Sequence, residues 1–151
     1  MKKIIEFSIL IILLIILIYF GRPKLAAFYY NQGVDYYDRH LYEEAIVSFR
    51  QSLKIDPSAG TTHYMLGNAY GEKGREAEAI EAYKKAIRIN PRLIQAHQAL
   101  VQTYWGNRMY QEALNQLKQT EVIFPDNQEI KILLNEVSFE YIADYLGKGV
   151  D

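Results

Sequence analysis

The sequence contains no cysteine, which excludes disulfide bonds, thiolate catalysis, cysteine-ligated metals and a lipid-modified N-terminal cysteine. A cysteine-free chain is compatible with either side of a bacterial membrane, so this absence does not decide the compartment. An excess of positive charge is also missing, because 17 Lys and Arg residues stand against 18 Asp and Glu residues. A nucleic-acid-binding protein needs clustered positive charge to displace counterions, so the net charge of −1 argues against that class.

Proline is scarce, with four residues in the chain. Pro57, Pro91 and Pro125 follow one another at steps of 34 residues. Four further positions keep the same step: Tyr36, Tyr70 and Tyr104; Ala45, Ala79 and Ala113; Glu44, Glu78 and Glu112; and Ile55, Ile89 and Ile123. A fixed period of this length indicates stacked supersecondary units, none of which buries its apolar face alone.

One long apolar run lies near the N-terminus. The basic start Met1–Lys3 precedes Ile4–Phe20, in which Glu6 and Ser8 are the only polar residues. In helical form such a run spans roughly 25 Å, at the short end of what crosses a bilayer core. We therefore predict that residues 1–25 are a transmembrane anchor and a short linker, with residues 4–20 in the lipid bilayer.

Two other interpretations of this run remain open. A cleaved signal peptide is one. It is disfavoured because Leu25 would stand three positions before the cut, where a small residue is needed, and because Arg22 and Lys24 directly follow the apolar run. A buried core helix is the other, although nothing in the repeats requires a partner that is apolar all round. An uncleaved anchor is the favoured interpretation.

Orientation in the membrane is nearly balanced under the positive-inside rule, since Lys2 and Lys3 face Arg22 and Lys24 across the run. A short basic start followed by an apolar run and a folded domain resembles a signal-anchor. We therefore predict a single-pass protein of the bacterial inner membrane, with its repeat domain in the periplasm rather than the cytoplasm.

Each repeat is predicted to be a pair of helices joined by a turn, because apolar residues recur at helical spacing. The second helix of each pair ends before its proline, since the residue preceding proline avoids the helical region. The predicted pairs are 26–39 with 42–55, 60–73 with 76–89, and 94–107 with 110–123.

Two glycines predict where the helices approach closely. Gly33 and Gly67 lie in helix interiors, where glycine costs roughly 1 kcal/mol relative to alanine. That cost is explained if the partner helix crosses at these points, and we expect it to do so at Ala45 and Ala79.

With these residues the chain resembles the tetratricopeptide-repeat family, whose pattern has a large residue, then leucine, glycine, tyrosine, alanine, an aromatic, alanine and proline. The second repeat fits best, with His63, Leu66, Gly67, Tyr70, Ala79, Tyr83, Ala86 and Pro91. The first has Tyr29, Gln32, Gly33, Tyr36, Ala45, Phe49, Ser52 and Pro57. The third has His97, Leu100, Val101, Tyr104, Ala113, Leu117, Thr120 and Pro125, and Val101 in place of glycine implies a wider crossing.

The predicted fold is therefore all-α: an α-solenoid of three helix pairs (26–59, 60–93 and 94–127), preceded by one transmembrane helix. Residues 128–151 are predicted to be a capping helix and a tail. The cap's apolar stripe is Ile130, Leu133, Leu134, Val137, Tyr141 and Ile142, and its other face is polar, as the end of a solenoid requires.

No catalytic, cofactor-binding or metal-binding residues are predicted, and we expect no enzyme. His63 and His97 share one repeat position, which allows either a shared metal site or simple filling of the same slot between helices. Packing is favoured, because zinc needs at least three protein ligands. Gly67, Gly71 and Gly74 are not followed by the Lys-Ser or Lys-Thr pair of a phosphate loop.

The family resemblance implies a groove lined by the first helix of each pair. The residues assigned to a binding surface there are Tyr30, Val34, Tyr37, Tyr64, Asn68, Gln95, Gln98, Gln102 and Trp105. Asp38, Thr61 and Glu72 take the remaining inward positions. Aromatic rings and amides suit recognition of a peptide or helix. The simpler alternative is that Trp105, the Gln residues and some of the tyrosines are solvated surface or pack on the cap helix. Family members that bind acidic chaperone tails use a clamp of lysine, asparagine and arginine, of which only Asn68 is in place.

The sequence thus predicts a membrane-anchored adaptor or scaffold that binds a protein or peptide partner near the bilayer and helps to assemble a complex. A permanent structural subunit of a larger membrane complex is the alternative. Neither interpretation involves a cofactor or nucleic acid.

Overall fold

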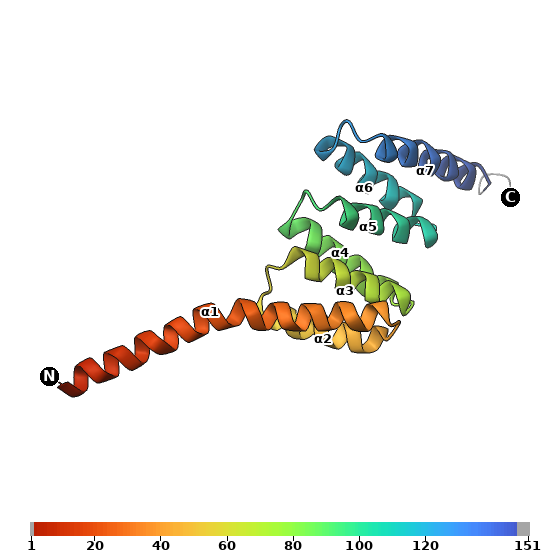
Figure 1. Ribbon diagram of the computed structural model, residues 1–151. Coiled ribbons are helices and arrows are strands. Elements are labelled where there is room, and N and C mark those ends of the chain that lie inside the picture. Colours follow the sequence, from red (N-terminus) through yellow and green to blue (C-terminus); the bar gives the residue numbers. More distant parts are fainter. Residues whose placement is uncertain (1, 148–151) are drawn as a thin grey trace.

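The computed structural model describes residues 2–147, including all side chains in that range except those of residues 2–6, 13, 16–20, 145 and 146. All secondary structure in this part is helical, and the helices stack in chain order (Figure 1). They are α1 (Lys2–Asp38), α2 (Tyr42–Ile55), α3 (Gly60–Glu72), α4 (Glu76–Ile89), α5 (Ile94–Gly106), α6 (Tyr110–Ile123) and α7 (Gln128–Gly147). The predicted all-α solenoid of three helix pairs and a final helix is confirmed.

The N-terminal helix differs from the prediction. A break was expected at residues 21–25, but α1 runs without interruption from Lys2 to Asp38 and contains Pro23. Figure 1 shows a bend part-way along α1, and an internal proline is a common cause, because it removes one backbone hydrogen bond. Packing against α2 begins at Ala26, whose carbonyl accepts a hydrogen bond of 2.9 Å from Ser52 Oγ.

Within the part of the chain that the structure describes, no helix combines the length and the apolar character needed to cross a membrane. The predicted span, residues 4–20, includes several residues whose side chains lie outside the described ones. The membrane anchor therefore stays a prediction.

The turn between the two helices of a pair has the same backbone conformation in all three repeats. His40, Gly74 and Arg108, one from each repeat, have positive φ angles of 60°, 66° and 57°. Their backbone N–H groups, and those of the next residues, donate back into the last turn of the first helix. This is the Schellman arrangement, in which the residue with positive φ is usually glycine because a Cβ atom is strained there.

We expect Arg108→Gly to stabilise the protein by about 0.5–1 kcal/mol, since relief of the left-handed strain exceeds the added entropy of the unfolded chain. Chemical denaturation followed by circular dichroism measures the change. Arg88→Gly is the matched control, because Arg88 lies in the interior of α4, where glycine costs about 1 kcal/mol. Equal destabilisation by both substitutions would contradict the strain argument.

Aromatic rings explain the two interior glycines. A Cβ atom on Gly33 would lie 2.6 Å from the Phe49 ring, and one on Gly67 would lie 2.5 Å from the Tyr83 ring. The close approach was predicted correctly, but its partner was not, because the group that fills the space is the ring one turn beyond Ala45 or Ala79.

The third pair, α5 and α6, has different residues at the positions of this glycine and this aromatic ring. Val101 replaces the glycine and Leu117 replaces the aromatic ring, and both are buried, with exposed fractions of 1% and 0%. A residue larger than glycine on α5 is therefore accompanied by a residue smaller than an aromatic ring on α6. The pair α5–α6 is also packed less closely than the first two, as the presence of Val101 predicted.

Helix α7 covers the end of the third repeat. Ile130 and Val137 are fully buried there, which confirms the centre of the predicted stripe. Ile142 was placed in the same stripe wrongly, since 54% of it is exposed. Ile132 and Phe139 are exposed as well, so the outer face of α7 is partly apolar instead of wholly polar.

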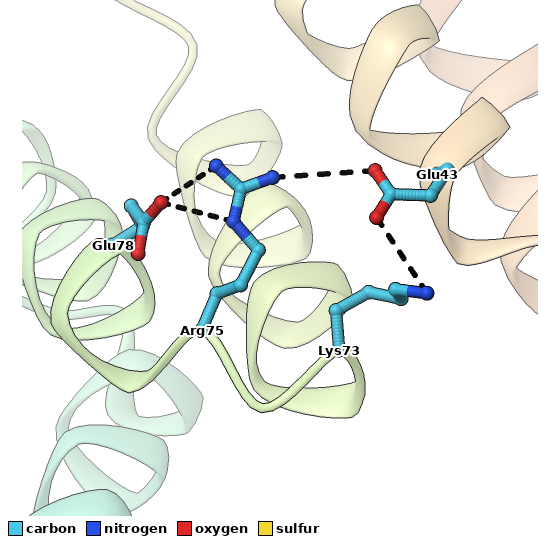
Figure 2. A network of polar contacts seen from close by, with 4 residues as sticks. All are labelled: Glu43, Lys73, Arg75 and Glu78. Atoms are coloured by element: carbon cyan, nitrogen blue, oxygen red, sulfur yellow. Dashed lines mark hydrogen bonds and ion pairs between the residues drawn. The ribbon is translucent and has the colours of Figure 1, made fainter.

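A polar network joins the first two repeats (Figure 2). The Arg75 guanidinium donates two hydrogen bonds to Glu78 Oε1, at 2.6 and 2.9 Å, and lies 4.0 Å from the Glu43 carboxylate. Lys73 Nζ reaches the same carboxylate at 3.5 Å. Because all four side chains are well exposed, water screens the ion pairs, and the network contributes little to the stability of the fold.

Candidate functional site

The first helices of all three pairs line one cavity of about 480 Å³, which we call the groove. Its walls are Tyr37 from α1; Tyr64, Asn68, Gly71 and Glu72 from α3; Tyr83 from α4; and Gln95, Gln98, Ala99, Gln102 and Thr103 from α5. Six of the nine residues that sequence reasoning assigned to a binding surface are therefore brought together. Their role in binding stays a prediction.

Contacts between tyrosines shape the floor of the groove. The Tyr83 hydroxyl donates a hydrogen bond of 2.9 Å to Asn68 Oδ1, which orients the amide. The ring of Tyr64 lies 6.1 Å from that of Tyr83, centroid to centroid, in a tilted arrangement. Gly67 makes room for Tyr83, so the glycine of the repeat pattern also sets the depth of the groove.

Neutral hydroxyls surround one carboxylate at the edge of the groove. Burial, together with the Glu72 carboxylate and two neighbouring tyrosines, raises the pKa of Tyr37 to about 12. Burial also raises the pKa of Tyr83, with smaller contributions from Tyr64, Tyr37 and Glu72. Tyr37 and Tyr83 therefore stay protonated at neutral pH and act as hydrogen-bond donors.

Three of the predicted residues do not line the groove. Tyr30 packs on Phe49, with ring centroids 6.0 Å apart, and Val34 and Trp105 are partly buried against the core. These three side chains therefore contribute to helix packing.

Glu72, which was expected at an inward position, also lines the groove, and sequence reasoning left out four further lining residues: Gly71, Tyr83, Ala99 and Thr103. Gly71 and Ala99 lie three or four positions from predicted members on the same first helices, so helical periodicity would have found them. Thr103 directly follows Gln102 on α5. Tyr83 comes from a second helix, and only its contact with Asn68 identifies it.

The two histidines have a structural role. His63 Nε2 donates to the carbonyl of Pro57 at 3.1 Å, and His97 Nε2 donates to the carbonyl of Pro91 at 3.0 Å. Each ring therefore ties the loop between repeats to the next helix. Among the described residues, no group of His, Asp and Glu side chains is arranged to hold a metal ion.

These rings make stability depend on pH. Burial lowers the pKa of both His63 and His97 below 6.5, so the unfolded chain takes up protons more readily than the folded one. We expect the free energy of unfolding to fall as pH decreases from about 6.5 towards 5, and to be insensitive to these groups above that window. Thermal melts across this range test the prediction. The variant His63→Gln/His97→Gln should show a flatter profile, and an unchanged profile would contradict the assignment.

A second and larger cavity, of about 700 Å³, lies between α2 and α4 over α3. Basic residues such as Arg50, Lys54 and Lys85 line it together with Glu78 and Glu81. With charges of both signs on its walls, it favours no single class of ligand.

Comparisons with known proteins agree with this geometry. A model of the tetratricopeptide repeat matches residues 61–93, and a second TPR-repeat model matches residues 33–74. The chain contains tetratricopeptide repeats. No curated protein sequence matches it.

Solved structures share the fold of these repeats. The first TPR domain of Spaghetti (RPAP3), bound to the HSP90 peptide SRMEEVD, is 19% identical and superposes with a TM-score of 0.70, covering 79% of this chain and 94% of that one. The TPR2B domain of yeast Sti1 in its pHsp70 complex is also 19% identical, with a TM-score of 0.69 and coverage of 78% and 98%. MamA is 29% identical, with a TM-score of 0.61, and the match covers 63% of this chain and 56% of MamA.

Proposed function

We propose that the protein is a membrane-anchored TPR adaptor, which binds a protein or peptide segment in its groove and helps to assemble a complex at the bilayer surface. The observation that carries the proposal is the groove itself, in which three helices from three repeats present hydroxyl, amide and ring groups to one cavity. Such side chains supply both contact area and hydrogen bonds to a partner. Structurally similar repeats that bind peptides support this use of the surface.

The anchor in this proposal is the apolar run of residues 4–20, which lies on the same helix as the wall of the first repeat. With no flexible linker between them, the groove would stand at a fixed height close to the lipid. A partner in the same membrane then meets the groove at a high effective concentration without any additional contact.

Site-specific photocrosslinking in native membranes tests the adaptor proposal. A photoreactive residue at Gln102, which is exposed and lines the groove, should capture a distinct partner. The same group at Lys118, which is exposed on α6 outside the groove, serves as the control. Recovery of only the protein itself from both positions would count against an adaptor.

For location, we propose the bacterial inner membrane, with the repeats on the periplasmic side. The order of basic start, apolar run and folded domain supports this orientation. A C-terminal alkaline phosphatase fusion should be active and a C-terminal green fluorescent fusion dark. The opposite pattern would place the repeats in the cytoplasm.

A permanent subunit of a larger membrane complex is the second candidate. The exposed apolar residues Ile132, Phe139 and Ile142 on α7 favour it, since a contiguous apolar face is usually covered. In that case the protein should co-purify in fixed ratio with the complex and be lost from cells when the complex is removed.

A further inference from the structure

The groove has no positive charge of its own. None of its eleven lining residues is lysine or arginine, and its one charged member is Glu72. A second carboxylate, that of Glu129, adjoins the groove, because its Oε2 accepts a hydrogen bond of 2.7 Å from the groove residue Gln98. The surface is therefore electronegative, although the chain as a whole is close to neutral.

We propose that the groove binds a partner segment that presents a lysine or arginine side chain to Glu72. This inference rests on the proposed function and specifies the chemistry of the partner.

Glu72 has the surroundings that recognition of a cation requires. Tyr37 and Tyr42 lie beside it with ring centroids 5.4 Å apart, and the carboxylate raises the pKa of both, after burial as the main cause. An ionised carboxylate has about four acceptor sites, so two phenol hydroxyls leave room for an ammonium or guanidinium group. Tyrosine rings attract the same cations through their π faces.

Acidic partners are disfavoured by the same charges. The HSP90 peptide bound by the Spaghetti domain, SRMEEVD, ends in several carboxyl groups. In this groove such groups would lie near Glu72 and Glu129 with no cation among the lining residues to compensate. Like charges that are brought together on binding repel each other, so the groove disfavours acidic partners by the same charges that favour basic ones.

A display library of random peptides, selected on the detergent-solubilised full chain, tests the inference. The wild type should enrich peptides with lysine or arginine at one defined position. Glu72→Gln should lose that preference, whereas Glu76→Gln should keep it, because Glu76 lies on α4 outside the groove and its replacement changes the net charge equally.

Titration with synthetic peptides measures how much the basic residue contributes to affinity. Replacing the basic residue of an enriched peptide by glutamine should weaken binding to the wild type about fivefold, as expected for an ion pair that is partly exposed. The same replacement should have no effect on binding to Glu72→Gln, which shows that the two groups interact.

Failure of the cation inference can be distinguished from failure of the adaptor proposal. Groove-dependent peptides without a basic preference, or with an acidic one, would overturn the cation inference and leave the adaptor proposal intact. Gln102→Trp fills the groove from an exposed position. If no peptide is enriched, or if enriched peptides still bind this variant, both the inference and the adaptor proposal fail.

Discussion

Replacing Gly67 by valine should destabilise the repeats by about 3 kcal/mol, at the upper end of the cost of overpacking a core. A Cβ atom there would lie 2.5 Å from Tyr83 Cε1, and valine adds two further methyl groups. The ring cannot move aside easily, because Tyr83 is only 4% exposed and its hydroxyl is bonded to Asn68. Urea denaturation followed by circular dichroism measures the loss.

Gly71→Ala is the control for this substitution. Gly71 lies on the same helix, and a Cβ atom there meets nothing closer than the Tyr83 hydroxyl at 3.8 Å. With space available, alanine should be neutral or stabilise the helix by up to about 1 kcal/mol.

The third repeat suggests a rescue. Its Val101 and Leu117 occupy the positions of Gly67 and Tyr83, so the double variant Gly67→Val/Tyr83→Leu copies a pair that this fold already accommodates. The double variant should be more stable than Gly67→Val alone, which is a favourable coupling between neighbours. If the two losses simply add, steric conflict with the ring is not the cause.

The boundaries of the repeat helices were predictable from the sequence because local signals specify them. Prolines end the second helices, and the turn residues close the first ones through local backbone bonds. These signals lie within a few residues of the structure that they specify. The partner of Gly67 was predicted less well, because the period identifies which residues are equivalent and not which side chain fills a given space.

The ends of the solenoid were predicted less well than its repeats. A break was expected at residues 21–25, yet α1 continues through Pro23, since the helical segments on both sides offset the loss of one hydrogen bond. On α7, apolar residues occur on more than one side, so periodicity alone did not decide that Val137 packs and Ile142 does not.

Six of the residues that line the groove were assigned to a binding surface because the family resemblance gives the inward positions of each repeat. Tyr30 and Trp105 do not line this cavity and pack against the core, since a large ring at such a position packs wherever a neighbour leaves space. Tyr83 was missed because it reaches the groove from a second helix, between two first helices. Such contacts depend on how repeats stack, which the sequence of one repeat does not specify.

The largest loss of stability is expected for Phe49→Ala, at about 3–5 kcal/mol. The ring is fully buried, fills the space opened by Gly33 and packs against Tyr30. Truncation removes apolar contacts and leaves a cavity that the two helices cannot close without moving. Val47→Ala is the matched control on the same helix, since Val47 is 59% exposed and its truncation should cost little.

The loss should be local, because each unit of a solenoid contacts only its neighbours. Hydrogen exchange in Phe49→Ala should accelerate in the part of α1 after Ala26 and in α2, and remain near wild-type rates in α5 and α6. Since α1 also carries the proposed anchor, this variant would keep the membrane helix while loosening its hold on the groove, and partner crosslinking at Gln102 should fall. Uniform acceleration across all helices would instead mean that the repeats unfold as one unit, and equal losses from Phe49→Ala and Val47→Ala would contradict the assigned core.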